Sequence, residues 1–308
     1  MMRISTSQFQ QVSLKAILDQ QSGLSKTQEQ LATGKRILVP SDDPTASALL
    51  VDINQAMDVY KQFNSNADQA EMRLRMEENA LASVATVLQR ARELAVQGNN
   101  DTYSPEQLLG IASEVRSLQD EILGLANSTD ANNDFLFSGY QGQTKPFDTF
   151  GGGTGVAASF SYNGDQGKRL IQIGSERSVA DSDSGFEVFA KVSDPSAPGS
   201  YMTVFQTVDE LAVNLENAAV TGANIDAIDA ALDHVLQFQS TVGARLNAID
   251  RQRTVNDDFI NQMTMTRSDL QDLDFASAVS KMNLQMTGLN AAQQTFTKVQ
   301  GLSLFNYL

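Results

Sequence analysis

The hydrophobic pattern of the two flanks constrains the fold of this chain more than any other feature. Apolar residues return at steps that alternate between three and four positions, which is typical of helices that pack along a coiled-coil seam. Both flanks are therefore predicted to be long helices. The five seams run over residues 17–38, 63–95, 108–125, 225–249 and 275–296, and the second contains Phe63, Ala67, Ala70, Leu74, Glu77, Leu81, Val84, Leu88, Ala91 and Ala95.

The middle of the chain has a different composition. Residues 135–205 hold 11 of the 21 aromatic residues and 11 of the 20 glycines. Alternating runs such as Phe160-Ser161-Tyr162 are separated by glycine-rich breaks, of which Gly151-Gly152-Gly153 is the clearest. Short strands joined by tight turns are typical of such a pattern. We therefore expect a β-rich insert between the helical flanks.

Several helix boundaries can be read from capping residues. Ser41-Asp42-Asp43-Pro44 offers N-cap side chains followed by Pro at the first helical position, and Ser104-Pro105-Glu106-Gln107 is a capping box. We expect helices to stop at 98–100 and at 132–133, and to break near Asp272-Leu273-Asp274.

The fold class predicted from these patterns is mainly α with a β insert. The N- and C-terminal flanks would form an elongated antiparallel coiled coil or helical bundle, with a small β-rich domain at the distal end. The predicted segments are an N-terminal assembly segment (1–40, disordered in the monomer), two parts of the bundle (41–134 and 206–272), the insert (135–205) and a C-terminal assembly segment (273–308).

Composition excludes several function classes. A net charge of −15 argues against a nucleic-acid binder, which needs a basic face. The absence of Cys and the single His exclude thiol nucleophiles, disulfide frameworks and Cys/His zinc sites. The apolar runs are too short to span a membrane, and the N-terminus lacks a signal-peptide core, so the protein is predicted to stay inside the cell unless a dedicated export machine recognises it.

The remaining motifs do not support catalysis or cofactor binding. Gly151–Gly155 is predicted to be a loop and not a phosphate site, because no Lys and no helix follow it. Asp130–Asp134 fails as a calcium loop, since Phe135 and Gln141 stand where Gly and Glu are needed. Asp181–Gly185 is predicted to be a solvated turn, and His234 is predicted to lie on the flank of a helix seam. The acidic residues are spread over helix faces, so we expect no convergent pair of carboxylates that could catalyse a reaction. We therefore predict no enzyme, no cofactor and no metal.

Charge and hydrophobicity together indicate that the two ends of the chain assemble. Residues 1–40 carry +3 and residues 275–308 carry +2, so the region between them carries −20. The seams at the two ends have no obvious partner in this acidic middle, and we expect them to be disordered until they pair in an assembly. Met282 and Met286 would serve as an adaptable interface. The predicted assembly interface is Ile17, Leu24, Leu31, Phe275, Val279, Met282, Met286, Leu289 and Phe296.

Four segments carry a resemblance to a known family. Residues 31–37 and 40–44 resemble the N-terminal signature of bacterial flagellins and their relatives, and residues 88–97 match another stretch of that family. Phe135–Tyr140 resembles the segment that leads into the β module of these proteins. Residues 3–8 and 301–308 are more similar to the family members that join hook and filament than to the filament flagellins.

The resemblance implies a structural subunit of a tubular helical assembly in the bacterial flagellum, outside the cell. Its partners would be other copies of itself in a helical ring, the adjacent hook-associated junction protein, flagellin, and an export chaperone at the C-terminal segment, with neither nucleic acid nor membrane. It would leave the cell unfolded through the flagellar type III export channel, without a cleaved signal peptide. The alternatives are a short flagellin and an unrelated secreted coiled-coil binding protein.

The stretch Leu88–Gln97 also matches the region of flagellins that is recognised by an innate immune receptor. Arg90 and Arg92 are the charged candidates for such a contact. They are equally compatible with solvated charges on a helix surface, which is the interpretation we favour. A binding assay with that receptor distinguishes the two.

Overall fold

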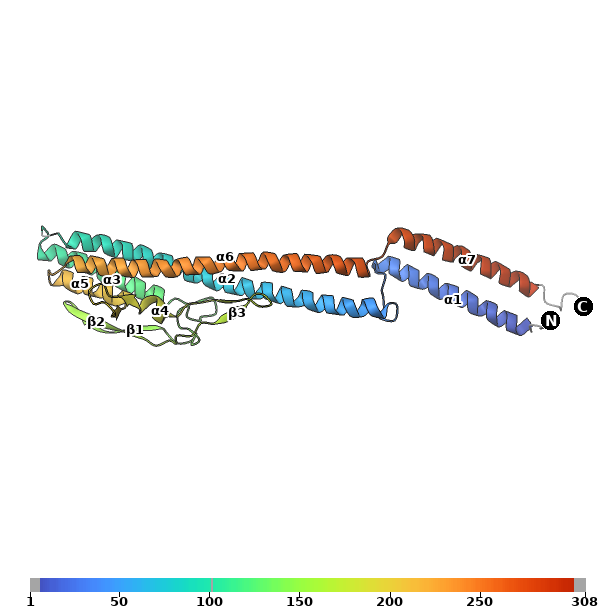
Figure 1. Ribbon diagram of the computed structural model, residues 1–308, viewed down its shortest axis with the longest axis horizontal. Helices are drawn as coiled ribbons and strands as arrows, with labels where there is room; N and C mark the ends of the chain where they lie inside the picture. The colour runs from blue at the N-terminus through green and yellow to red at the C-terminus, as the bar shows by residue number, and fades with distance from the viewer. Residues whose placement is uncertain (1–5, 101, 302–308) are drawn as a thin grey trace, which may run out of the picture. The chain divides into compact units, whose positions relative to one another are not determined.

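The computed structural model describes residues 6–100 and 102–301, and it divides the chain into two compact units. Unit 1 comprises residues 1–59 and 258–308, and unit 2 comprises residues 60–257. The segments 3–8 and 301–308, which were compared with the family above, lie mostly outside the described residues. The long helices of the flanks are α1 (Thr6–Thr33), α2 (Pro44–Gly98), α6 (Gly222–Gln271) and α7 (Phe275–Gly301), of which α2 and α6 contribute to both units (Figure 1).

The seam predicted along α2 forms part of the buried core of unit 2. All ten of its residues from Phe63 to Ala95 are buried, as the 3.5-residue period predicts. Helix α6 lies antiparallel to α2, because Asn256 Nδ2 donates to Asn64 Oδ1 (3.0 Å) near one end while Arg92 pairs with Asp229 near the other. The antiparallel pairing of the two flanks is thus confirmed in this unit.

Two shorter helices complete the helical part of unit 2. Helix α3 (Pro105–Ala126) begins at the predicted capping box, where the Ser104 hydroxyl accepts from the Gln107 N–H and the Gln107 side chain accepts from the Ser104 N–H. It packs against α5 (Val204–Glu216), which the sequence reasoning did not separate from its surroundings. The predicted stop at 132–133 is wrong: α3 ends six residues earlier, and Asn133 instead sits in a turn with φ +66°.

The insert consists of three antiparallel hairpins and one short helix, α4 (Gly185–Phe189). Gly151, Gly152 and Gly155 take positive φ of +69°, +89° and +70° around the first hairpin turn, a conformation that glycine adopts without steric cost. The prediction of a loop over Gly151–Gly155 is wrong for its first part, because Gly151–Gly153 belong to a strand and only Thr154 and Gly155 form the turn. The strand pairs are β1 (Phe147–Gly153) with β2 (Val156–Tyr162), β3 (Leu170–Gln172) with β4 (Ser178–Ala180), and β5 (Val192–Ser193) with β6 (Tyr201–Met202).

Aromatic residues join the insert to the helices. The ring of Phe147, at the start of β1, lies 4.8 Å between centroids from Phe205 in α5 and 5.6 Å from Phe189 in α4. Phe137 lies 5.0 Å from Phe189, and all four rings are buried. These rings belong to the same hydrophobic cluster as the α2 seam. The insert therefore shares the core of the helices.

The prediction of a solvated turn at Asp181–Gly185 is wrong. Asp181, Ser182, Asp183 and Ser184 are each no more than 2% exposed. Their charges are matched by basic residues from elsewhere in the chain: Arg169 pairs with Asp181, and Arg245 pairs with Asp183 through two N–H groups (2.8 and 2.9 Å). A polar sequence was buried because its ionic partners were supplied by α6 and by the segment before β3.

Candidate assembly interface

Within unit 1, α1 and α7 form an antiparallel pair. The pairing runs from Gly34 beside Phe275 at one end to Gln20 beside Gly288 further along. Along α1 and at its end, one row of partly or fully buried residues follows alternating steps of four and three, with Gly23 and Gln30 beside it. This face is Ser13, Ile17, Gln20, Leu24, Thr27, Leu31 and Gly34. The predicted residues Ile17, Leu24 and Leu31 therefore lie on the face that meets α7.

Helix α7 uses a different seam from the one predicted. Its shielded residues in the pair are Ala278, Met282, Gln285, Leu289, Ala292 and Phe296, again at alternating steps of four and three. The sequence pattern predicted a seam through Phe275, Val279, Met282, Met286, Leu289, Gln293 and Phe296, which includes three apolar side chains that lie outside this face: Phe275, Val279 and Met286. These three side chains are 55%, 42% and 44% exposed. The α7 residues of the predicted interface thus divide between two faces: Met282, Leu289 and Phe296 meet α1, and the other three face solvent.

We call Phe275, Val279 and Met286 the outer stripe of α7. Because they are spaced four and seven residues apart, they lie on one side of the helix, next to the face that packs on α1. Leu14 and Leu18 on α1 are also half exposed, at 50% and 55%, and sequence reasoning missed them because they lie off its seam. A pair of helices with apolar residues left outside it has surface available for further contacts.

Polar and small residues leave the α1–α7 contact with little buried apolar surface. Gln20 Nε2 donates to the backbone carbonyl of Gln285 (3.3 Å), while the buried Gln285 Oε1 has no hydrogen-bond partner. A Cβ at Gly23 or Gly288 would come within 3.2 or 3.0 Å of the opposing glutamine side chain, so glycine allows the close approach. A polar layer of this kind fixes the register of a coiled coil and lowers its stability.

The connections at the ends of this pair are tied to each other. Gly34, with φ +70°, ends α1, and its carbonyl accepts from the Leu273 N–H (2.9 Å). The Arg36 N–H donates to the Gln271 carbonyl (2.7 Å), which completes a short antiparallel bridge between the α1–α2 and α6–α7 connections. The predicted break at 272–274 is confirmed. The bridge lies where α1 ends and α7 begins.

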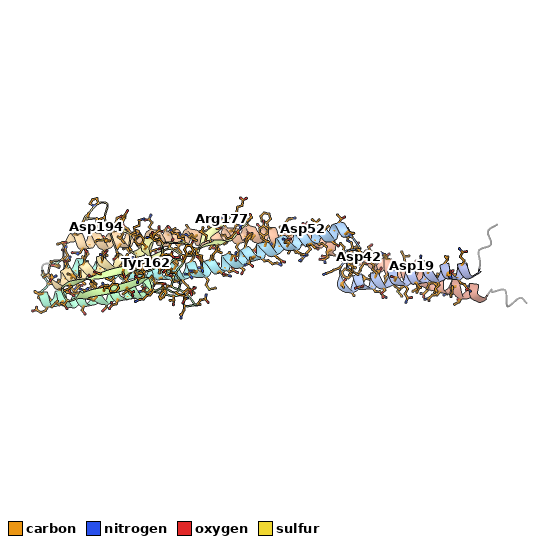
Figure 2. All side chains as sticks on the ribbon, turned by 90° about the horizontal axis from the view of Figure 1, so that it is seen from below. Asp19, Asp42, Asp52, Tyr162, Arg177 and Asp194 are labelled. Atoms are coloured by element: carbon orange, nitrogen blue, oxygen red, sulfur yellow. The ribbon has the colours of Figure 1, made fainter. Side chains whose placement is uncertain are left out.

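Two aspartates stabilise the α1–α2 connection, and Figure 2 labels one of them, Asp42. Asp43 is the N-cap of α2, where its carboxylate accepts from the Ala46 N–H (3.0 Å), as the Asp43-Pro44 sequence predicts. Asp42 accepts from Lys26 and from the Leu38 N–H (3.1 Å), and the Lys26 contact, more than any other, lowers the pKa of Asp42. The residues that resemble the flagellin signature thus fix the turn between α1 and α2.

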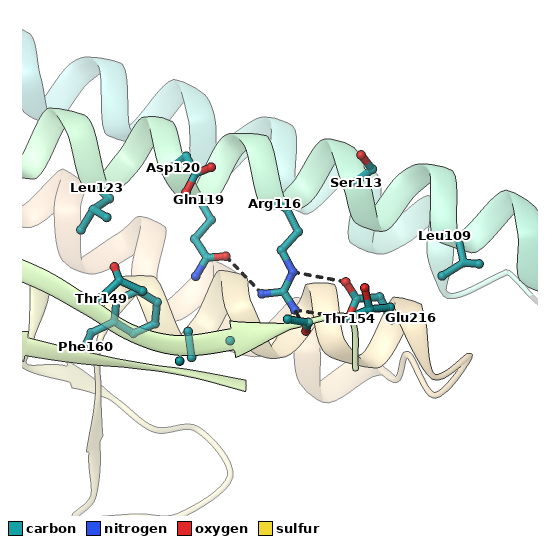
Figure 3. Close-up of a pocket in the computed structure, with 14 residues that line it drawn as sticks. Leu109, Ser113, Arg116, Gln119, Asp120, Leu123, Thr149, Thr154, Phe160 and Glu216 are labelled. Carbon is teal, nitrogen blue, oxygen red and sulfur yellow. Dashed lines mark hydrogen bonds and ion pairs between the residues drawn. The ribbon is translucent and has the colours of Figure 1, made fainter. Parts of the chain in front are cut away.

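A cavity of about 440 Å³ in unit 2 lies between α3 and the β1–β2 hairpin (Figure 3). Arg116 projects into it and pairs with Asp209 and with Glu216 (3.2 Å). Asp209 also accepts from the Ala158 N–H (2.8 Å), and Glu216 from the Gly155 N–H. These contacts hold the hairpin on the helices, which is a structural role.

The other candidate sites are also occupied by structural contacts. His234 Nε2 lies 2.9 Å from the Glu187 carbonyl, and its ring packs on Phe238. Among the described residues, no group of three His, Cys, Asp or Glu side chains is placed to hold a metal ion, and no helix is long and apolar enough to span a membrane.

Arg90 and Arg92 lie on the surface of α2 and form ion pairs within the chain. Arg90 pairs with Glu93 (2.8 Å) and Glu114 (2.7 Å), and Arg92 pairs with Asp229. About half of each arginine side chain is exposed, which is typical of solvated helix charges.

Both flanks of the chain match regions of one known protein family. The bacterial flagellin N-terminal helical region matches residues 4–142, and the bacterial flagellin C-terminal helical region matches residues 225–308. Together these two regions cover more than half of the chain, and they leave out residues 1–3 and 143–224, which hold most of the insert, α5 and the first residues of α6.

Individual relatives differ in how much of the chain they match. Flagellar hook-associated protein 3 of Escherichia coli is 30% identical over 321 aligned positions, which cover 99% of both proteins. A flagellin of Clostridium tyrobutyricum is 36% identical over 115 residues, which are 37% of this chain and 30% of that protein. The solved flagellar junction protein FlgL from Legionella pneumophila covers 73% of this chain and 100% of its own, with a TM-score of 0.62 and 22% identity, a likeness of fold.

Proposed function

Because this chain belongs to the bacterial flagellin family and matches flagellar hook-associated protein 3 over 99% of its length, we propose that it is a structural subunit of the bacterial flagellum at the junction between hook and filament. The family is one of structural proteins and not of enzymes. The match to flagellar hook-associated protein 3 is the observation that supports the proposal most, because it extends through the insert, whereas the two flagellin regions stop at residue 142 and resume at residue 225.

The outer stripe of α7 supports an assembly role. Phe275, Val279 and Met286 stay about half exposed in the single chain, although full burial of such a side chain contributes about 1.5–3 kcal/mol. In the proposed junction, the α1–α7 pairs of neighbouring copies pack together and cover these side chains. The predicted interface thus has two layers: Ile17, Leu24, Leu31, Met282, Leu289 and Phe296 within the chain, and the outer stripe between copies.

The partners and the route follow from the same proposal. Contacts with other copies form a helical ring, and contacts with the adjacent hook-associated junction protein and with flagellin lie on its two sides. An export chaperone would bind the C-terminal segment and cover the outer stripe before assembly. The chain would pass unfolded through the flagellar type III channel without a cleaved signal peptide.

We expect the α1–α7 pair to open readily in the monomer, because Gln20, Gln285 and the two glycines leave it few apolar contacts. In limited proteolysis of the full chain, cleavage should begin before residue 40 and after residue 273, while the segment from 60 to 257 persists. Ends that resist protease as long as this segment does would contradict the proposed disorder-to-order assembly.

The experiment that tests the proposed function uses purified protein and isolated hooks. Addition of the protein together with the adjacent junction protein should allow flagellin to polymerise from the hook end, while the protein alone forms no long filaments. The match to flagellins favours one second candidate, a short filament subunit. Long filaments formed by the protein alone would support that candidate and overturn the junction role.

A further inference from the structure

A buried polar loop joins the insert to the two long helices of unit 2. The loop comprises residues 181–184, each no more than 2% exposed, and it leads into α4. Asp183 is held by Arg245 of α6 through two N–H groups and by Lys168 Nζ (3.2 Å). These contacts place a carboxylate deep between the insert and α6, with both of its oxygens bonded.

A second carboxylate meets this loop from α2. Glu77 stands in the apolar seam between Leu74 and Leu81 and is 1% exposed. Its Oε1 accepts from the Asp183 N–H (3.2 Å), while its Oε2 is buried with no hydrogen-bond partner. The sequence analysis, which found the acids spread over helix faces, did not predict that Glu77 contacts the backbone of Asp183. Two buried acids meet where α2, α6 and the insert come together.

The surrounding bases leave Glu77 without a counter-ion of its own. Arg245 gives both terminal N–H groups to Asp183, and Lys168 is shared between Asp183 and Glu187 (2.6 Å). Arg73, the nearest base on α2, pairs with Asp130 (2.9 Å) and donates to the Phe135 carbonyl. An ionised carboxylate in such a position is costly, whereas a neutral carboxyl group could use its O–H as a donor.

We propose that Glu77, Asp183 and Arg245 form a proton-dependent latch, in which a proton held on Glu77 keeps the loop of residues 181–184 docked between α2 and α6. When the proton leaves, the buried charge on Glu77 lies near the Asp183 carboxylate with no ion-pair partner. The cost of burying that charge and the repulsion between the carboxylates then outweigh the hydrogen bond from the Asp183 N–H. The loop then separates from the helices, and the orphan Oε2 gains water.

The direction of the pH effect follows from the burial of Glu77. Burial, followed by the neighbouring Asp183 charge, raises the pKa of Glu77 from 4.5 to about 8. The docked state then holds a proton that the released state loses above pH 4.5. The latch is fully closed below that value, and its closed-to-open ratio falls about tenfold for each pH unit until pH 8.

Hydrogen exchange of the full chain tests the latch. After correction for intrinsic exchange rates, amide protection in residues 181–190 should fall about tenfold per unit between pH 6 and pH 8. Glu77→Gln keeps an acceptor but cannot ionise, so its protection should be independent of pH. Glu78→Gln, one position along α2, is the matched control and should keep the pH dependence of the unchanged chain.

Protection that stays constant from pH 6 to pH 9 in the unchanged chain would overturn the latch, and so would a Glu77→Gln chain with the same pH dependence. A second measurement does not depend on whether a variant folds: carbon-13 NMR of the unsubstituted chain, labelled at the glutamate carboxyl groups. It should show one carboxyl group that titrates near pH 8 together with amide shifts in residues 181–184. Titration of every glutamate below pH 6 would also overturn the proposal.

Discussion

Met286→Asp should remove filaments from the cell while leaving unit 2 folded. Met286 is 44% exposed in the single chain and lies outside the α1–α7 seam, so a charge there is tolerated before assembly. In the proposed junction it would be buried against other copies, where an unpaired carboxylate costs several kcal/mol per subunit. Since 1.4 kcal/mol is a factor of ten, the attached flagellin should fall about tenfold or more. The measurement is the ratio of flagellin attached to cells to flagellin released into the medium.

Ser280→Asp is the matched control for this prediction. It adds the same charge to the same helix at an exposed position about a third of a turn away from Met286 and far from the face that meets α1. It should retain filaments, and both variants should keep the thermal unfolding of the unchanged chain. A Met286→Asp strain with filaments attached normally would show that the outer stripe is not an interface.

Phe147→Ala should lower the free energy of unfolding of unit 2 by about 3–5 kcal/mol, the usual cost of removing a buried phenylalanine. Its ring contacts Tyr162, Phe189 and Phe205, so one substitution in β1 removes contacts with β2, α4 and α5. Because the insert and the helices share this core, denaturation followed by helical circular dichroism should shift as much as denaturation followed by tyrosine fluorescence.

Phe150→Ala provides the comparison within the same strand. Phe150 is 58% exposed, and its truncation should change the free energy of unfolding by no more than about 0.5 kcal/mol. If Phe147→Ala moved the fluorescence transition alone and left the helical signal in place, the insert would be an independent domain and the shared core would be wrong.

The parts of the fold that sequence predicted well are those set by local rules. The α2 seam from Phe63 to Ala95 is buried at every predicted position, because its regular 3.5-residue period places all of these residues on one side of the helix. The start of α2 at Pro44 and of α3 at Pro105 follow from capping side chains, and the break before Phe275 follows from the same kind of local pattern.

The α7 seam was predicted at the wrong rotation because two apolar stripes overlap on that helix. Ala278, Gln285 and Ala292, which pack on α1, carry little hydrophobic signal, while the exposed Phe275, Val279 and Met286 carry more. The hydrophobic pattern therefore combined residues of the intrachain seam with the outer stripe. Helix α5 had a usable signal that was missed, namely the capping box formed by Thr203 and Gln206 before an apolar repeat.

The buried polar loop could not have been predicted from its own residues. Asp181–Ser184 has the composition of a surface turn, and its burial depends on Arg169, Lys168 and Arg245, of which Arg245 lies 62 residues from Asp183. Glu77 gave a partial signal, since an acid in an otherwise apolar seam requires an explanation. The pairing of the two acids depends on tertiary structure alone.

The most direct test of the junction role is a strain that lacks this chain. The account predicts that such cells build hooks of normal length, make flagellin, and release it into the medium as monomer, and that the unchanged gene restores attached filaments. Cells without the chain that still carry filaments on their hooks would contradict the central claim.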